Sequence, residues 1–195
     1  MGILTITTTL SVPHPLILGV IYLLSEVFLA VTRRSGSGAT SHDRRSLFLL
    51  WGVISISIWL GISVSVVHSA TLPHLHLCYV VGLLLFIAGV VLRWYSIVYL
   101  GRFFTVDVAI AHEHELIDSG PYHFIRHPSY TGALIAFVGF GLCLGSWLAL
   151  ACMVLPITAA FLWRIHVEEQ ALADALGDNY RAYMRRTKRL IPFVY

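Results

Sequence analysis

The chain has 195 residues, of which 57% are hydrophobic and only 12% are charged, and its mean hydropathy is +0.80. Soluble domains carry about 25% charged residues, so this composition excludes a soluble monomer. The net charge of +3 is too small to indicate a nucleic-acid partner. The three cysteines lie in apolar runs without a CxxC motif, which argues against a disulfide framework and a zinc knuckle. We therefore interpret the chain as an integral membrane protein.

Three apolar runs in the first half of the chain predict membrane-spanning helices, because a crossing needs about 20 apolar residues. The first run covers residues 15–31 and contains one acid, Glu26. The second run, 47–67, has no charged residue. The third run, 76–100, is interrupted only by Arg93.

A fourth run, 131–163, holds 33 uncharged residues. As a single helix it would be about 50 Å long, too long for one crossing, so it predicts a C-terminal helical hairpin. The residues expected to break it are Gly139, Gly141, Gly145 and Ser146. The expected fold is all-α with about five transmembrane helices. We divide it into helices one and two (1–75) and a core (76–195).

Basic residues set the expected orientation, because they concentrate on the cytoplasmic side of membrane proteins. With five crossings, twelve of them fall on one side: Arg33, Arg34, Arg44, Arg45, Arg102, Arg126, Arg164, Arg181, Arg185, Arg186, Lys188 and Arg189. The polar segments 101–130 and 164–195 also lie on that side. The second segment has a helical period that breaks at Gly177, so we expect it to fold back over the loop.

The segment 114–130 concentrates the residues suited to chemistry, and reads HELIDSGPYHFIRHPSY. The Gly-Pro turn and the proline after His127, which keeps that residue out of the helical region, constrain the loop. Its aromatic faces, from Tyr122, Phe124 and Tyr130, suit a planar adenine and a sulfonium cation. Arg164 and Glu168 alone would predict an i,i+4 surface salt bridge, but beside this loop we favour a ligand site.

Three motifs in order carry a resemblance to a known family. They are G-P-Y-x-x-x-R-H-P-x-Y-x-G from residue 120, R-x-x-x-E-E from residue 164, and G-x-x-Y-x-x-Y from residue 177. Together they resemble the isoprenylcysteine carboxyl methyltransferases of membranes, over about residues 90–195. The chain looks like a short, five-helix form of that family.

The resemblance implies that S-adenosylmethionine binds on the cytoplasmic side, and that a lipid-like or prenylated acceptor enters from the bilayer. The loop and the C-terminal helix would then form the cofactor pocket. By position, the implied cofactor contacts are His114, Glu115, Leu116, Ile117, Tyr122, His127, Pro128, Ser129, Tyr130 and Glu168. Arg93 and Arg164 fall where the family holds the acceptor's carboxylate.

Arg93 also stands out without the family, because a charge about two turns inside a span is costly and suggests function. The alternative is that its long side chain extends to the interface. Glu26 is a candidate structural partner of Arg93, and we give it no catalytic role.

Carboxyl methylation suits these residues. A carboxylate with a pKa near 4 is already ionised and needs no general base, and a guanidinium is well suited to holding it in a dry site. The main alternative is a phospholipid or amine N-methyltransferase, whose cationic acceptor Arg93 and Arg164 would repel, although His127 or Glu169 could act as its base. A transporter would need polar residues along several spans or an inverted repeat, and a reductase would need a dinucleotide-binding motif. The sequence shows none of these features.

The ten histidines lack the spacing of a metal site, so we expect no metal. The membrane would be the endoplasmic reticulum in a eukaryote and the inner or plasma membrane in a prokaryote. The natural acceptor stays open.

Overall fold

The fold is all-α, as expected. The computed structural model describes residues 14–32, 44–67, 70–104 and 116–192. Its helices are α1 (Pro15–Thr32), α2 (Arg44–Val64), α3 (Leu75–Leu100), α4 (Pro128–Cys143), α5 (Trp147–Leu176) and α6 (Asp178–Arg186), with the short 3-10 helices η2 (Gly101–Phe103) and η3 (Gly120–His123). Across these ranges there is no β-strand, and only two isolated bridges occur.

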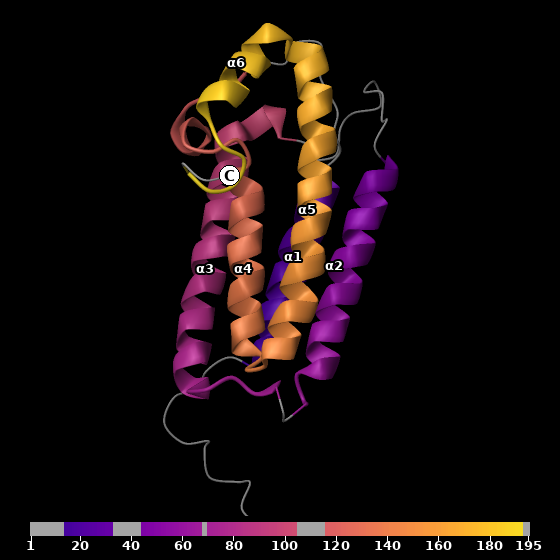
Figure 1. Cartoon of the computed structure of the whole chain (residues 1–195), viewed down its shortest axis with the longest axis vertical. Coiled ribbons are helices and arrows are strands. Elements are labelled where there is room, and N and C mark those ends of the chain that lie inside the picture. The colour runs from indigo at the N-terminus through magenta and orange to yellow at the C-terminus, as the bar shows by residue number, and fades with distance from the viewer. Residues whose placement is uncertain (1–13, 33–43, 68–69, 105–115, 193–195) are drawn as a thin grey trace, which may run out of the picture.

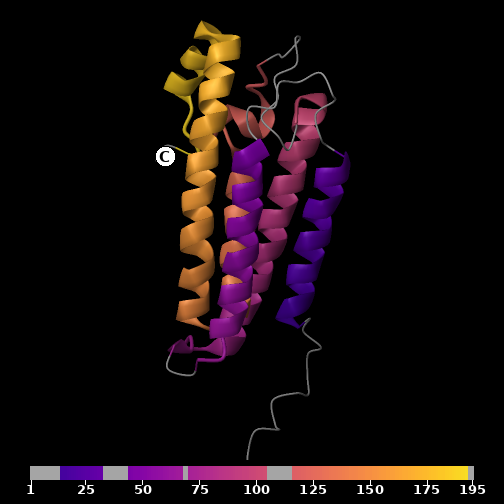
Figure 2. The same cartoon turned by 90° about the vertical axis from the view of Figure 1, so that its right-hand side faces the viewer.

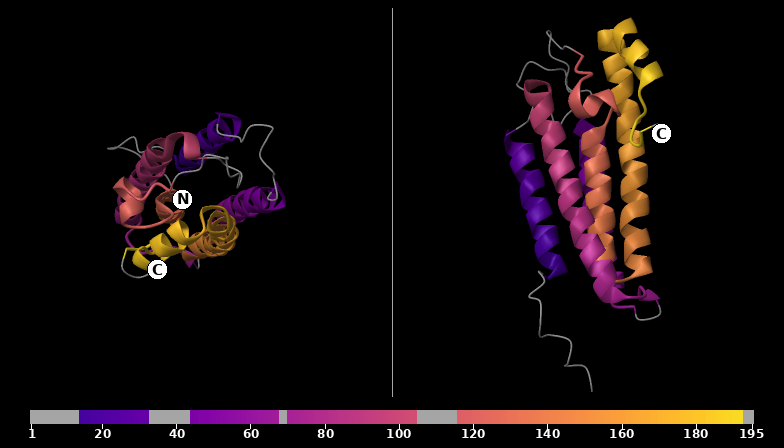
Figure 3. Two further views of the ribbon diagram at one scale, coloured as in Figure 1. Left: turned by 90° about the horizontal axis from the view of Figure 1, so that it is seen from above. Right: turned by 90° about the vertical axis from the view of Figure 1, so that its left-hand side faces the viewer.

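Helices α1 to α5 run side by side along the long axis, and α6 crosses one end of the bundle (Figure 1). The same end carries the last turn of α1, the first turn of α2 and the last turn of α3 (Figure 2). Viewed from above, α3 and α4 lie together, as do α2 and α5, while α1 lies apart from α2 (Figure 3). The described residues of the polar segments that we expected on one side of the membrane therefore gather at one end.

Three helices are long and apolar enough to cross a bilayer by length and composition: Ser46–Val64, Leu75–Leu100 and Trp147–Leu176. Two shorter apolar helices accompany them, Pro15–Leu29 and Pro128–Cys143. The 16 residues of α4 extend about 24 Å, less than the roughly 30 Å of hydrocarbon. The protein is an integral membrane protein, and a count of five full crossings stays a prediction.

Large apolar side chains are exposed along the outer faces of the bundle, including Val20, Leu24, Phe28, Phe48, Trp59, Leu84 and Val91. In water, such a surface would be strongly unfavourable, whereas lipid tails solvate it. The interior is packed by Ala133, Ala136, Phe137, Phe140, Met153, Ile157 and Phe161, which come from α4 and α5. These two helices therefore form the centre of the bundle.

Glycines bring α3 and α4 close together. A Cβ added at Gly82 would lie 2.6 Å from the carbonyl oxygen of Gly139, and one at Gly132 would lie 2.6 Å from that of Gly89. Such close approach is the role of small residues between helices in membranes. The expected hairpin is confirmed, but the prediction that Gly139 helps to break it was wrong, because this glycine serves packing inside α4.

The hairpin turn lies at residues 144–146 instead. Gly145 has a φ of 68°, a left-handed conformation that glycine adopts without strain. Ser146 then caps α5, because its side chain accepts a hydrogen bond from the amide of Ala149. Gly141, like Gly139, lies within α4, so the expectation of a break there was also wrong.

Helix α5 is longer than its apolar part. It has 30 residues, about 45 Å, which exceeds the bilayer core by about 15 Å. The helical period expected after residue 164 is therefore a continuation of α5, which ends at Leu176 and is followed by Gly177, where φ is 58°. The division into 1–75 and 76–195 stays a prediction.

Candidate active site

A cavity lies at the end of the bundle where the polar segments gather. One part of its wall comes from the apolar faces of α1 and α2: Tyr22, Leu29, Leu47, Leu50, Trp51 and Ile54. The rest comes from α3 to α6 and their connections, including Phe103, Phe104, Phe161, Leu172, Tyr180 and Tyr183. The cavity therefore has an apolar part between the membrane helices, which continues into a polar part beneath α6.

Most of the expected site residues line this one cavity. They are Arg93, Leu116, Ile117, Tyr122, His127, Ser129, Tyr130, Arg164 and Glu168. Pro128 is fully buried and begins α4, where its fixed φ suits the first helical position. His114 and Glu115 lie outside the described residues. The structure thus brings together residues from three separate stretches of the chain, namely α3, the segment 116–130 and α5, while their roles stay predictions.

The loop before α4 is fixed from two sides. The hydroxyl of Tyr122 donates to the carbonyl of Ser96 on α3 at 3.2 Å. The hydroxyl of Tyr183, on α6, donates to the carbonyl of Tyr122. Burial raises the pKa of the Tyr183 phenol, so this hydroxyl keeps its proton and remains a donor. The aromatic face of Tyr122 is thereby held against the cavity.

Glu169 is the centre of an ion-pair cluster that the sequence analysis missed. Its carboxylate accepts from Arg126 Nε at 2.8 Å and from Arg189 Nε at 2.9 Å, and it lies 3.3 Å from His127 Nε2. Glu169 is 3% exposed. The R-x-x-x-E-E motif pointed to this acid, but nothing in the sequence paired it with arginines 43 and 20 residues away.

The tail after α6 docks on the same loop through its backbone. The amides of Arg126 and His127 donate to the carbonyls of Lys188 and Arg189 at 2.8 and 3.0 Å. The hydroxyl of Thr131 donates to the carbonyl of Leu190 at 2.8 Å. The expectation that the C-terminal segment folds back over the loop is confirmed for the described residues.

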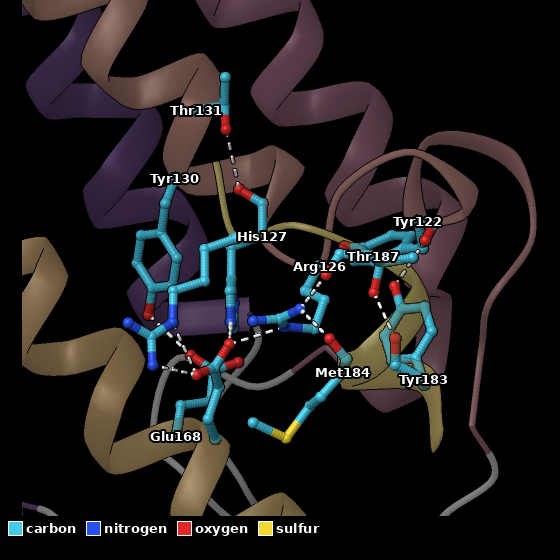
Figure 4. Close-up of polar contacts among 11 residues, drawn as sticks. Tyr122, Arg126, His127, Tyr130, Thr131, Glu168, Tyr183, Met184 and Thr187 are labelled. Atoms are coloured by element: carbon cyan, nitrogen blue, oxygen red, sulfur yellow. Dashed lines mark hydrogen bonds and ion pairs between the residues drawn. The ribbon is translucent and has the colours of Figure 1, made fainter. Parts of the chain in front are cut away.

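Tyr130 and Glu168 meet on the cavity wall. The Tyr130 hydroxyl donates to Glu168 Oε2 at 3.0 Å, and its ring packs against Phe161 with centroids 5.1 Å apart. Figure 4 shows Tyr130 and His127 directed from the start of α4 toward the carboxylates of α5. Neighbouring acids thus have separate partners, because Glu168 faces the cavity while Glu169 anchors the loop and tail.

Arg164 and Arg93 lie at matching depths. Arg164 is 17 residues from the start of α5, and Arg93 is 18 residues from the start of α3, so each is about 26 Å from the far end of the bundle. Arg164 is 2% exposed and donates to the hydroxyl of Ser46 on α2. It lies within α5, directly after the apolar run 131–163 from which we predicted the second arm of the hairpin.

Arg93 binds the acid that we considered as its partner. Its Nε and Nη2 donate to the two carboxylate oxygens of Glu26 at 2.6 and 2.7 Å, which confirms that pairing. Its Nη1 donates to the carbonyl of Ser129 at 3.3 Å.

Within the described part of the chain, no three His, Cys, Asp or Glu side chains are grouped to hold a metal.

Comparisons with known proteins agree with this architecture. Residues 80–174 match the family model described as the isoprenylcysteine carboxyl methyltransferase (ICMT) family. The chain is 36% identical over 116 residues to a probable protein-S-isoprenylcysteine O-methyltransferase of Oryza sativa subsp. indica, covering 58% of this chain and 61% of that protein. It is also 36% identical over 115 residues to protein-S-isoprenylcysteine O-methyltransferase B of Arabidopsis thaliana, covering 58% of each.

The chain spans about three fifths of the length of these relatives. Its fold is similar to the solved structure of a eukaryotic intramembrane Ras methyltransferase, ICMT, with a TM-score of 0.63 and 23% identity, over 95% of this chain and 70% of that one. The matched segment contains α4 together with Arg93, Arg164 and Glu168. Residues 80–174 of this chain are therefore similar to the isoprenylcysteine carboxyl methyltransferase family.

Proposed function

We propose that this protein is an S-adenosylmethionine-dependent membrane methyltransferase that esterifies the carboxylate of an isoprenylcysteine or a similar lipidic acid. One observation carries the proposal. A single cavity combines apolar faces of α1 and α2, the buried guanidinium of Arg164, and the Tyr130–Glu168 pair. An acceptor with a prenyl chain and a carboxylate needs the first two features, and a cationic methyl donor suits the third.

The residues present fit the proposed cofactor. The carboxylate of Glu168 can accept hydrogen bonds from ribose hydroxyls or an ammonium group, and Tyr122, Tyr130 and Phe161 offer aromatic faces to an adenine or a sulfonium. Leu116 and Ile117 add apolar wall beside them. S-adenosylmethionine, when bound, supplies an electrophilic methyl group on a positively charged sulfur.

The protein's own part in the reaction is alignment and charge placement. Arg164 binds the acceptor's carboxylate through a planar fork that matches its two oxygens. The carboxylate held by Arg164 would accept the methyl group that the cofactor supplies, and the sulfur would leave as a neutral thioether, so the opposite charges would cancel and no proton would move. A dry cavity favours this step, because it strips water from the attacking anion. Holding the acceptor carboxylate and the methyl donor in line accounts for much of the rate acceleration.

We further propose that the site faces the cytoplasm. Support comes from the described residues of the polar segments, which gather at one end of the bundle (Figure 2). Further support comes from the twelve basic residues that five crossings place on that side.

The replacement Arg164→Leu tests the role of this arginine. We expect it to leave the dissociation constant of S-adenosylmethionine within about threefold of wild type. We expect it to lower kcat/KM for N-acetyl-S-farnesylcysteine at least about thirtyfold, since truncating one partner of a desolvated charge pair costs about 2–5 kcal/mol. Arg164→Lys should recover little of this loss, because an ammonium lacks the two-pronged geometry.

The matched control is Arg181→Leu, a change at an exposed arginine on α6. If Arg164→Leu keeps full activity on the carboxylate acceptor, the proposed role is wrong. If it methylates amines faster than wild type does, the protein is an N-methyltransferase instead.

A further inference from the structure

The ion pair between Glu26 and Arg93 crosses a boundary in the chain. Arg93 lies inside the family-matched segment, residues 80–174, whereas Glu26 lies outside it on α1. Helix α1 reaches the core by packing on α4, where the rings of Tyr22 and Phe137 have centroids 4.8 Å apart. A helix outside the matched segment therefore supplies the counter-ion of a core arginine.

The geometry of the pair is that of a guanidinium bound to a carboxylic substrate. Both oxygens of Glu26 accept from Arg93, at 2.6 and 2.7 Å, and each side chain is 11% exposed. Such bidentate pairs are among the strongest charge-assisted contacts. Both residues also line the cavity that contains Arg164. Glu26 thus occupies the face of Arg93 that an acceptor's carboxylate would need.

An incoming carboxylate gains little by displacing Glu26. Separating a buried ion pair leaves an uncompensated charge in a medium of low dielectric constant, which is strongly unfavourable. The acceptor would replace one carboxylate by another on Arg93 while leaving Glu26 without its cation. The pair is therefore expected to stay intact, with Arg93 Nη1 holding the carbonyl of Ser129 at the start of α4.

We propose that Glu26 is a specificity-determining residue: by neutralising Arg93 inside the cavity, it restricts the acceptor to a single carboxylate, held at Arg164. This inference rests on the proposed carboxyl methylation. With Glu26 in place, a second carboxylate on the acceptor meets an ion pair without net charge. Without Glu26, the same carboxylate meets an unneutralised guanidinium. Acceptor selectivity by charge is thus set from α1, outside the matched segment.

The test compares two acceptors that differ by one carboxylate, N-acetyl-S-farnesylcysteine and N-succinyl-S-farnesylcysteine. The quantity measured is the ratio of kcat/KM for the dianion to that for the monoanion, scored as methyl ester at the cysteine carboxylate. We expect Glu26→Gln to raise this ratio at least about tenfold over wild type, because a new desolvated charge pair forms. Asp178→Asn, at an exposed position, is the control and should leave the ratio unchanged.

A second variant covers the case in which Glu26→Gln does not fold. Glu26→Gln combined with Arg93→Met removes both charges, a change that buried ion pairs often tolerate. We expect it to keep the dianion ratio within about threefold of wild type and to raise KM for the monoanion no more than about fivefold. The main loss should be in kcat, because the variant lacks the hydrogen bond from Arg93 to the carbonyl of Ser129. Binding of S-adenosylmethionine, measured by calorimetry, reports that each variant is folded.

Two results would overturn the inference. One is a folded Glu26→Gln variant whose ratio stays within about threefold of wild type. The other is a double variant whose monoanion KM rises fiftyfold or more, about 2.3 kcal/mol, with cofactor binding unchanged, because Arg93 would then hold the acceptor directly. A wild-type protein that esterifies neither acceptor would instead contradict the proposed function itself.

Discussion

Replacing Glu169 by glutamine removes the negative charge that joins the loop before α4 to the C-terminal tail. The wild-type carboxylate binds Arg126 and Arg189 and lies beside His127. The glutamine amide has almost the same shape but carries no charge and adds two donors, which face existing donors. The expected consequence is a local one, in which the tail separates from the loop more often.

The size of the effect follows from the burial of the partners. Arg126 is 7% exposed at its side chain, and leaving a buried charge without its counter-ion costs about 3–5 kcal/mol. Its Nη1 still donates to the carbonyls of Met184 and Thr187, which favours the lower end of that range. The side chain of Arg189 is 30% exposed, so its pair adds less than about 1 kcal/mol. We expect a loss of about 3 kcal/mol.

Hydrogen–deuterium exchange of the tail after α6, residues 187–192, measures this loss in the intact protein in nanodiscs. A change of 3 kcal/mol corresponds to a protection factor lower by roughly a hundredfold. The matched control is Glu168→Gln at the neighbouring position, which removes the acceptor of the Tyr130 hydroxyl and should leave tail exchange near wild type. Equal protection in both variants and wild type would refute the argument that Glu169 anchors the tail.

Three further outcomes follow from the geometry. Tyr130→Phe removes the hydroxyl that donates to Glu168 at 3.0 Å, and calorimetry should show S-adenosylmethionine binding weakened about three- to tenfold; unchanged binding would remove Tyr130 from the cofactor site. Gly89→Ala places a Cβ against the backbone of α4, and thermal unfolding should report a loss of about 1–3 kcal/mol, whereas an unchanged Tm would contradict the close packing. In a background without native cysteines, Val66→Cys should label only from the extracytoplasmic side and Lys188→Cys only from the cytoplasm, and labelling of both from one side would exclude five crossings.

The helices that are defined by a long apolar run could be predicted from the sequence. The runs around α2 and α3 contain enough uncharged apolar residues to define a helix by the thickness of a bilayer. Glycine was harder to interpret, because the same residue type forms a turn at Gly145 and a helix contact at Gly139. Only the position of the neighbouring helix separates these two roles, and a single sequence does not contain it.

The same distinction applies to the site. The pairing of Glu26 with Arg93 could be anticipated, since two charges inside apolar runs are both costly unless they meet. The partners of Glu169 could not, because Arg126 and Arg189 lie in polar segments where arginines are common. The continuation of α5 beyond Trp163 was not predicted, because the length of the span was set by the apolar run. That run ends at Trp163, whereas the helix continues to Leu176.

The chemistry of the transferred methyl group is the most direct test of the account. Purified protein in nanodiscs is given S-adenosylmethionine with a labelled methyl group, together with N-acetyl-S-farnesylcysteine, its carboxamide, and membrane phospholipids. The account predicts a base-labile methyl ester on the free carboxylate and no label on the carboxamide, because the amide offers Arg164 no anion to bind. Base-stable label on phospholipid amines, with the farnesylcysteine carboxylate left unmethylated, would contradict it.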